Sequence, residues 1–211
     1  MTEIVIIDYK NGGNLFSVNN SLESIGASTQ LSSDPKVIES ASKIVFPGVG
    51  SFAKAITSLQ ELGIYDVLIK KIQEDTPVLA VCVGMQALFQ SSTETASFGD
   101  IVKGMGIIAA DVTKFDQKPG IKIPHMGWNS VHNHNPENPI FKGIAQDAHF
   151  YFVHSYRVDN QELTGYSKAT TDYGEQFISH IWNGKNLFAC QFHPEKSGEV
   201  GLQLLENFMR H

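Results

Sequence analysis

Stretches typical of β-strands alternate with stretches of helical periodicity through the first 90 residues, and this alternation constrains the fold more than any other feature. The strand-like stretches lie at residues 4–7, 29–31, 43–46 and 77–81. The run at 4–7 is apolar at every position, as in a central parallel strand that is buried on both faces. Between the runs, apolar residues such as Leu15, Val18 and Leu22 recur at helical spacing. This order predicts a parallel sheet covered by helices on both faces.

The second half has a different pattern, in which extended segments follow one another before a last helix. These segments lie at residues 107–112, 122–131, 148–153, 176–182 and 187–192. The pair Asn183-Gly184 between the last two is typical of a hairpin turn, because both residue types tolerate positive φ. We expect residues 1–211 to form one α/β domain, with a largely parallel sheet flanked by helices and an added antiparallel strand layer.

Composition and charge exclude several classes of function. The formal net charge is −6 and the chain has no basic block, so nucleic acid is not an expected partner. No stretch approaches the roughly 20 apolar residues of a membrane span, and the N-terminus reads as a strand rather than a signal peptide. With only two cysteines, a disulfide framework is not indicated, and we expect a protein of the reducing cytoplasm.

One of these cysteines, Cys82, lies between a strand and a helix. The segment 77–86 reads PVLAVCVGMQ, an apolar run followed by a thiol, a glycine and the start of a helical pattern. A tight turn of this kind lifts a nucleophile out of a sheet. The free N–H groups at the start of the helix favour a thiolate and an oxyanion. The alternative for an isolated cysteine is a buried core residue, because free cysteine is among the most buried residue types.

A candidate base for this thiol lies at residues 191–195, which read QFHPE. His193 ends an apolar strand, and Pro194 prevents the strand from continuing. Because side chains at i and i+2 of an extended segment point the same way, Glu195 is expected to hydrogen-bond one ring nitrogen of His193 and to leave the other for Cys82. The alternative is a polar strand end before a helix, with Glu195 in the first helical turn.

A third segment, PGVG at residues 47–50, also lies between a strand and a helix. The carboxyl ends of parallel strands meet at one edge of an open α/β sheet, where ligands bind. Glycines there allow the backbone to present N–H groups to the oxyanion of an acyl-transfer reaction. A phosphate-binding loop is the rival interpretation, but neither the Walker nor the dinucleotide glycine pattern fits, and an ordinary turn is the simplest alternative.

Taken together and in this order, the three segments resemble the class I (triad) glutamine amidotransferase family, whose fold is flavodoxin-like. The resemblance covers essentially the whole chain. Within the family, the sequence is most similar to the glutaminase subunits of imidazole glycerol phosphate synthases. That narrower similarity rests on DY at 8–9 with GGNL at 12–15, PHMGWN at 124–129, YFVHSY at 151–156 and KS at 196–197.

The resemblance implies a catalytic triad of Cys82, His193 and Glu195. Cys82 would attack the glutamine carboxamide and form a thioester, while His193, oriented by Glu195, would act first as base and then as acid as ammonia leaves. The backbone N–H of Val83 would be one oxyanion donor. The second donor would come from the peptide between Gly48 and Val49, which in this family is expected to flip when the partner responds to its own substrate.

The resemblance also assigns residues to the substrate and to a partner subunit. The residues implied to bind L-glutamine are Gly50, Gln86, Glu94, His154, Ser155 and Tyr156. Those implied to lie toward the partner are Trp128, Tyr151 and Lys196. The partner would be a (β/α)8-barrel cyclase that forms a heterodimer with this chain and uses the ammonia in histidine biosynthesis, and no cofactor is implied.

Three alternatives remain open from the sequence. A paralogous glutaminase would supply ammonia for amidation of a surface-polysaccharide sugar. A non-catalytic subunit would only gate its partner, and a cysteine hydrolase would share the elbow but act on another substrate. The family elbow usually reads Gly-x-Cys-x-Gly, whereas this chain has Ala80 at the first position; we expect the turn to survive. Cys190 is expected in the core, and the histidines show no spacing typical of a metal site.

Overall fold

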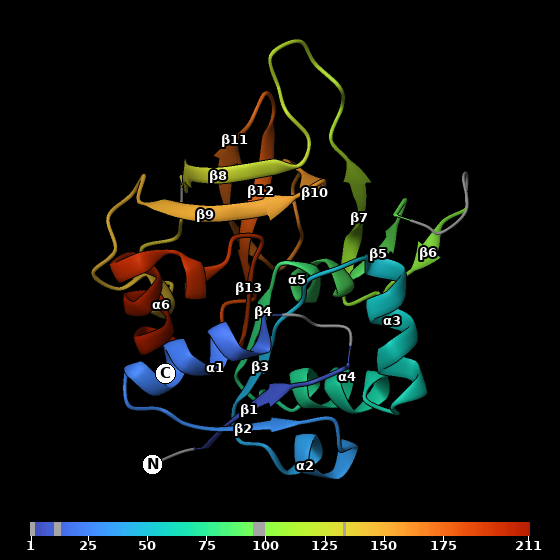
Figure 1. Ribbon diagram of the computed structural model, residues 1–211, viewed down its shortest axis with the longest axis vertical. Coiled ribbons are helices and arrows are strands. Elements are labelled where there is room, and N and C mark those ends of the chain that lie inside the picture. Colours follow the sequence, from blue (N-terminus) through green and yellow to red (C-terminus); the bar gives the residue numbers. More distant parts are fainter. Residues whose placement is uncertain (1–2, 11–13, 95–99, 133) are drawn as a thin grey trace.

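The computed structural model describes residues 3–10, 14–94, 100–132 and 134–211 (Figure 1). The GG pair at 12–13 of the GGNL motif lies outside the described residues. Within the described part of the chain, no helix is long and apolar enough to cross a membrane.

The centre of the molecule is a parallel sheet built from the predicted strands. Its members are β1 (Glu3–Ile7), β2 (Ser28–Ser32), β3 (Ile44–Phe46), β4 (Val78–Val81) and β13 (Leu187–Cys190). They are hydrogen-bonded in the order β2-β1-β3-β4-β13, and every neighbouring pair is parallel. All residues of β3, β4 and β13 are buried, because helices cover both faces.

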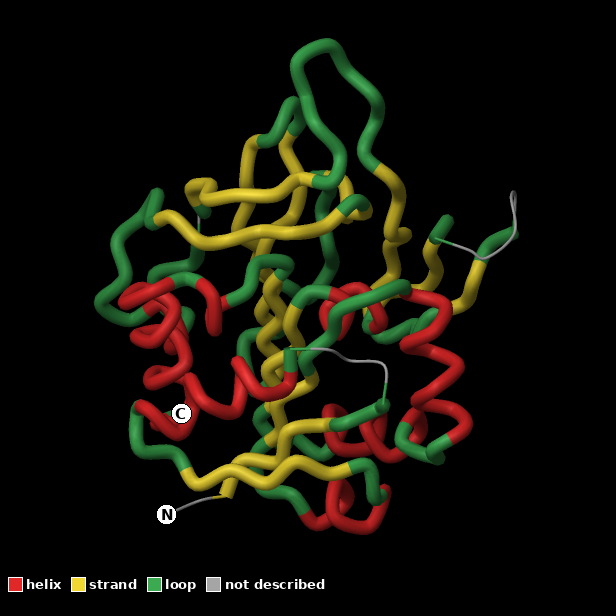
Figure 2. The backbone as a smooth tube through the Cα atoms, in the orientation of Figure 1, coloured by secondary structure: helices red, strands yellow, loops and turns green. Residues whose placement is uncertain are grey.

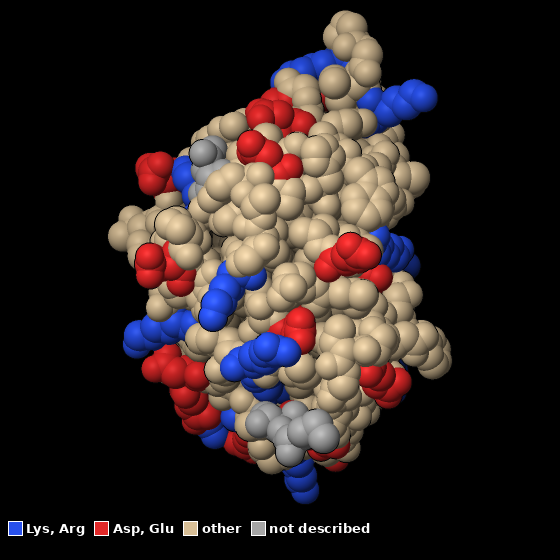
Figure 3. Space-filling view, turned by 90° about the vertical axis from the view of Figure 1, so that its left-hand side faces the viewer, with Lys and Arg blue, Asp and Glu red and all other residues tan. Residues whose placement is uncertain are grey.

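The helices lie on the two sides of these strands (Figure 2). They are α1 (Leu15–Ser24), α2 (Pro35–Ser40), α3 (Phe52–Glu61), α4 (Tyr65–Gln73), α5 (Val83–Ala87) and α6 (Gly198–Arg210). In the orientation of Figure 1, α1 and α6 lie side by side to the left of the central strands, and α3 and α4 lie together to the right. On the face that carries α6, acidic and basic side chains are interspersed (Figure 3).

Antiparallel strands extend this sheet beyond β13. They are β12 (Gln176–Trp182), β10 (Tyr156–Asp159), β7 (Ile108–Lys114), β5 (Phe89–Ser92) and β6 (Val102–Lys103), with β11 (Ser167–Asp172) paired to β12. All these pairings are antiparallel except that of β5 with β7. A separate antiparallel pair, β8 (His125–Ser130) and β9 (His149–His154), forms a second layer, and two 3-10 turns, η1 (Pro139–Phe141) and η2 (Pro194–Lys196), complete the fold.

The predicted fold class is confirmed, but several elements were missed or misplaced. The helix after Cys82 ends at Ala87, and Phe89 already begins β5, where a continuing helix was expected. Strands β10 and β11 were not predicted, because their polar composition gives no clear hydrophobic pattern in the sequence. The predicted segment 122–131 is a strand only from His125 to Ser130.

The sheet register brings the three candidate segments to one edge. Phe46 of β3 pairs with Ala80 of β4, and Val81 of β4 pairs with Cys190 of β13. PGVG, Cys82 and QFHPE follow directly after these three adjacent strands. Because the strands are parallel, their carboxyl ends lie together, and the three segments meet as the sequence predicts.

Candidate active site

Cys82 occupies a sharp turn between β4 and α5. Its backbone has φ 55° and ψ −110°, a conformation that residues other than glycine rarely adopt. The turn is held by hydrogen bonds from the Cys82 N–H to Cys190 O at 2.7 Å and from the Gln86 N–H to Cys82 O at 3.0 Å. The strain is therefore located at the thiol-bearing residue, which is a common property of functional sites.

The two small residues that flank the turn have different roles. A Cβ on Gly84 would lie 2.1 Å from the carbonyl oxygen of Phe46, so only glycine fits there. Ala80 instead lies within β4 in regular parallel pairing with Phe46 and Ala189. Its methyl group is accommodated in the buried sheet, and the elbow forms despite the departure from the family pattern, as expected.

His193 and Glu195 form a buried hydrogen-bonded pair. Nδ1 of His193 lies 2.7 Å from Oε1 of Glu195, and both side chains are 1% exposed. The predicted contact is present, but its geometry is not that of an extended segment. Glu195 lies in the 3-10 turn η2, which Pro194 begins, and the turn brings its carboxylate back to the imidazole.

The surroundings of His193 favour its protonated form. Burial alone would lower its pKa, but the Cys82 sulfur and the Glu195 carboxylate outweigh burial and raise the pKa of His193 to about 10. Nε2 of His193 is buried and makes no well-formed hydrogen bond among the described residues, and the Cys82 sulfur acts on the imidazole both through its charge and as a hydrogen-bond acceptor. A cationic imidazole beside Cys82 is the setting in which a cysteine is found as a reactive thiolate.

Two amide side chains to which the sequence assigned no catalytic role contact the predicted triad. Gln191 is fully buried, and its Nε2 donates to the Cys82 sulfur at 3.5 Å while its Oε1 accepts from Gln86 Nε2 at 2.9 Å. Asn14, at the start of α1, donates through Nδ2 to Oε1 of Glu195. Both residues belong to motifs noted in the sequence, QFHPE and GGNL. Their contacts join residues that are 109 and 181 positions apart, which the sequence does not reveal.

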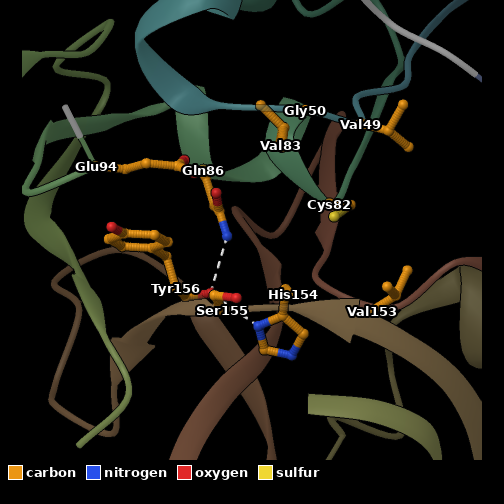
Figure 4. A pocket seen from close by; sticks show the side chains of 10 residues that line it. All are labelled: Val49, Gly50, Cys82, Val83, Gln86, Glu94, Val153, His154, Ser155 and Tyr156. Carbon is orange, nitrogen blue, oxygen red and sulfur yellow. Dashed lines mark hydrogen bonds between the residues drawn. The ribbon is translucent and has the colours of Figure 1, made fainter. Parts of the chain in front are cut away.

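A pocket of about 180 Å³ opens beside Cys82 (Figure 4). It is lined by Val49, Gly50, Cys82, Val83, Gln86, Glu94, Val153, His154, Ser155 and Tyr156. Every residue predicted to bind glutamine is therefore in its wall, and Val153 is the lining residue that the sequence analysis missed. The pocket is smaller than the roughly 300–1,000 Å³ of sites for drug-sized ligands, which suits a ligand of amino-acid size.

The polar groups of the pocket differ in their freedom to contact a ligand. Oε2 of Glu94 accepts from the Phe52 N–H at 2.8 Å, and burial raises the pKa of Glu94 although this hydrogen bond opposes the shift. Nε2 of Gln86 donates to both Tyr156 O and Gln191 Oε1, which leaves its Oε1 for a ligand. Both ring nitrogens of His154 are engaged with Tyr156 O and His125 Nδ1, so His154 contributes its ring and backbone to the pocket wall.

The two predicted oxyanion donors are not both available in this structure. The Val83 N–H, the first predicted donor, donates to the carbonyl oxygen of Gly48 at 3.4 Å. A carbonyl oxygen therefore occupies the position where an oxyanion would bind. Gly48 is in contact with the elbow but does not line the pocket, and a Cβ there would lie 2.6 Å from the Gly84 nitrogen.

The three residues predicted to face a partner lie together on β9, β8 and η2, and we call them the aromatic face. The rings of Trp128 and Tyr151 are 6.2 Å apart, and Lys196 Nζ lies 5.9 Å from the Tyr151 ring. Trp128 is 51% exposed, which is unusual for a tryptophan on a folded surface. Among the described residues, no three His, Cys, Asp or Glu side chains are placed to hold a metal ion.

Comparison with known proteins gives a match over nearly the whole chain. The family model for glutamine amidotransferase class-I matches residues 6–211. The chain belongs to this family, as the motifs predict.

More closely, the chain is 46% identical over 209 residues to the imidazole glycerol phosphate synthase subunit HisH of Acinetobacter baylyi, covering 99% of this chain and 98% of that protein. It is 42% identical to the chloroplastic imidazole glycerol phosphate synthase hisHF of Arabidopsis thaliana, where the match covers 98% of this chain and 34% of that longer protein. The solved structure of PurLQS from Thermotoga maritima shares the fold, with a TM-score of 0.75 at 15% identity over 99% of this chain and 98% of that one.

Proposed function

We propose that this chain is the glutaminase subunit of an imidazole glycerol phosphate synthase. It hydrolyses L-glutamine to glutamate and passes the ammonia to a cyclase subunit with a (β/α)8 barrel, in histidine biosynthesis. The observation that carries the chemistry is the buried His193–Glu195 pair next to a thiol on a strained elbow, at the mouth of a pocket of amino-acid size.

In this proposal Cys82 is the nucleophile. Its thiolate attacks the carboxamide carbon of glutamine, and His193, held by Glu195, donates a proton to the leaving nitrogen so that ammonia departs and a thioester remains. His193 then removes a proton from water, which attacks the thioester carbonyl and releases glutamate and the free thiol. Glu195 stabilises the imidazole whenever it is cationic, before it protonates the leaving nitrogen and after it removes a proton from water, which accords with the raised pKa of His193.

The oxyanion of each tetrahedral intermediate is to be held by the backbone N–H groups of Val83 and Val49. In the structure, Gly48 O accepts the Val83 N–H, so the peptide between Gly48 and Val49 must rotate before both donors face the oxyanion. This closed arrangement gives low activity to the isolated subunit and lets a partner control the rate, because rotation of one peptide completes the site.

The pocket residues divide between the two ends of glutamine. Gly50 allows close backbone approach, and Gln86 Oε1 and Glu94 supply acceptors for the ammonium group and the amide. His154 at the end of β9, Ser155 between the two strands and Tyr156 at the start of β10 form the opposite wall. Each of these assignments is part of the proposal.

The aromatic face is the proposed docking surface for the cyclase in a heterodimer. Residues 1–211 act as a single glutaminase domain, which corresponds to about a third of the longer Arabidopsis relative. We place the protein in the cytoplasm, since its two cysteines are both free and a reducing compartment keeps them so.

The decisive test is Cys82→Ala. With the cyclase subunit and its ribotide ligand present, the wild-type chain should release ammonia from glutamine, and Cys82→Ala should release none while still binding the cyclase. The matched control is Cys190→Ala, which removes the other thiol from the core of β13 and should keep the activity. Ammonia release by Cys82→Ala would contradict the thiol mechanism. The assigned pathway would be contradicted if the wild-type chain released ammonia only with a sugar amidotransferase and not with the cyclase.

A further inference from the structure

Tyr9 carries a buried hydroxyl that the mechanism above does not use. It follows β1 by two residues, its side chain is fully buried, and its ring packs edge-on against Phe46 at a centroid distance of 5.9 Å. The hydroxyl oxygen has no hydrogen-bond partner among the described residues. Buried polar groups without partners are uncommon and costly in native proteins, so this one calls for a physical reason.

The hydroxyl lies directly against the PGVG segment at residues 47–50, which we call the oxyanion loop. A Cβ built on Gly48 would be 2.8 Å from the Tyr9 Oη and 2.8 Å from the Val83 Cβ. Gly48 is thus in contact with the elbow and with Tyr9, and any side chain at this position would collide with both. The phenol is within reach of the peptide whose rotation the site requires.

A second cavity lies on the Tyr9 side of the same loop. It has a volume of about 220 Å³ and is lined by Tyr9, Val49, Gly50, Ser51, Lys54 and Ala55. Val49 and Gly50 also line the pocket beside Cys82, so this piece of backbone is the wall between two cavities. Gly48 lines neither cavity, but Val49, the next residue, lines both, so the peptide between them borders the cavity on the Tyr9 side.

The rotation needs compensation from a new contact. In the closed state Gly48 O accepts the Val83 N–H, and Val49 is absent from the residues with positive φ. Half a turn of the peptide separates that pair and carries φ of Val49 to positive values, which are unfavourable for a β-branched residue. The carbonyl that swings away also needs a donor, because a buried carbonyl without one is costly.

We propose that the Tyr9 hydroxyl donates a hydrogen bond to the Gly48 carbonyl after the peptide rotates, and so holds the oxyanion hole in its active form. This inference rests on the proposed function. The proposal explains why the Tyr9 hydroxyl has no partner in the closed state, since the Gly48 carbonyl reaches it only in the active state. Burial, together with the charge of Cys82, raises the pKa of Tyr9, so the phenol remains a donor over the working pH range. Tyr9 is a positioning residue, because it acts on the loop and not on glutamine.

The test is Tyr9→Phe, which removes the hydroxyl and keeps the ring. In the complex with the cyclase and its ribotide ligand, kcat for ammonia release should fall about tenfold, as expected for one hydrogen bond worth about 1.4 kcal/mol. KM for glutamine should change less than kcat. Alkylation of Cys82 by iodoacetamide should proceed at the wild-type rate, because that reaction forms no oxyanion.

A melting experiment separates this role from a structural one. The isolated Tyr9→Phe chain should have the same Tm as wild type or a higher one, since the lost hydroxyl had no partner in the closed state. The matched control is Tyr166→Phe, whose hydroxyl donates to Ile107 O at 3.2 Å. That variant should lose Tm and keep the stimulated kcat.

Two results would overturn the inference. One is a stimulated kcat of Tyr9→Phe equal to that of wild type. The other is a lower kcat accompanied by slower alkylation and a lower Tm, which would mean that Tyr9 only supports the fold. A wild-type complex that releases no ammonia would instead refute the proposed function, and the two failures are therefore distinguishable.

Discussion

At the scale of single residues, the proposed nucleophile contacts the side-chain amide of Gln191, to which the family resemblance assigned no role. Gln191 links Gln86 to the Cys82 sulfur through two hydrogen bonds inside a fully buried cluster. A donor aimed at sulfur favours the thiolate over the thiol. Gln191 therefore connects the floor of the pocket to the reactive atom, and both its partners lose a contact if it is replaced by an apolar residue.

Gln191→Met should slow the reaction of Cys82 with iodoacetamide at pH 7 by about tenfold or more, because a hydrogen bond to a charged group is worth roughly 1.5–3 kcal/mol. It should also lower the free energy of unfolding, since the Gln86 amide is left with one partner fewer. Gln203→Met on the outer surface of α6 is the matched control and should leave the alkylation rate unchanged. Equal alkylation rates for wild type and Gln191→Met would show that the amide does not act on the sulfur.

At the scale of elements, two strands bury neutral histidines in their interior. Burial, with the nearby His125 adding to it, lowers the pKa of His154 at the end of β9 to about 3. Burial, with the nearby His134, lowers the pKa of His180 in β12 to about 3 as well. In the unfolded chain both histidines titrate near 6.5, so the unfolded state binds protons between these values and the folded state does not.

Stability should therefore fall as the pH decreases from 6.5 toward 3. Each histidine contributes a slope of up to roughly 1.4 kcal/mol per pH unit. Urea denaturation between pH 7 and pH 5 measures this slope, and His180→Phe, which keeps a ring against Phe141, should reduce it. The raised pKa of His193 stabilises the folded state over the whole acid range, so it adds nothing to this slope. That stabilisation is lost as the pH rises from 6.5 through about 10. An identical acid slope in His180→Phe would refute the assignment.

At the scale of the whole molecule, the aromatic face lies directly behind the proposed catalytic base. The His193 N–H donates to Tyr151 O at 2.9 Å, and Ser197 Oγ donates to His193 O at 2.6 Å while it accepts the Tyr151 N–H at 3.0 Å. The backbone of His193 is thus fixed on both sides to the strand that carries Tyr151. A subunit bound to this face contacts the element that positions the base.

Trp128→Ala should weaken binding of the cyclase by tenfold or more, because exposed tryptophans at interface centres cost about 2 kcal/mol or more when truncated. Binding can be measured by titration calorimetry, and alkylation of Cys82 should remain at the wild-type rate because Trp128 does not line the pocket. Leu31→Ala on β2, the outermost strand of the parallel sheet, is the control and should bind normally. If Trp128→Ala bound the cyclase with wild-type affinity, the aromatic face would not be part of the interface.

The sequence by itself determined the parallel core and the positions of the reactive residues. Runs such as 4–7 and 77–81 are apolar throughout, as in parallel strands that are buried on both faces. The carboxyl ends of such strands lie at the same edge of the sheet. The residues that follow β3, β4 and β13 could therefore be brought together without coordinates. Strands β10 and β11 could not be predicted, because their partners and not their own patterns stabilise them.

The tertiary structure alone decided the contacts between distant side chains and the state of the oxyanion loop. The contact of Gln191 with Cys82, of Asn14 with Glu195, and of Tyr9 with Gly48 each depends on how far a side chain reaches across the sheet edge. The orientation of the peptide at Gly48 has no signature in the sequence, because the same residues permit both orientations. A pattern of residue types fixes which backbone segments meet, whereas hydrogen bonds between them depend on distances and angles that only the folded chain defines.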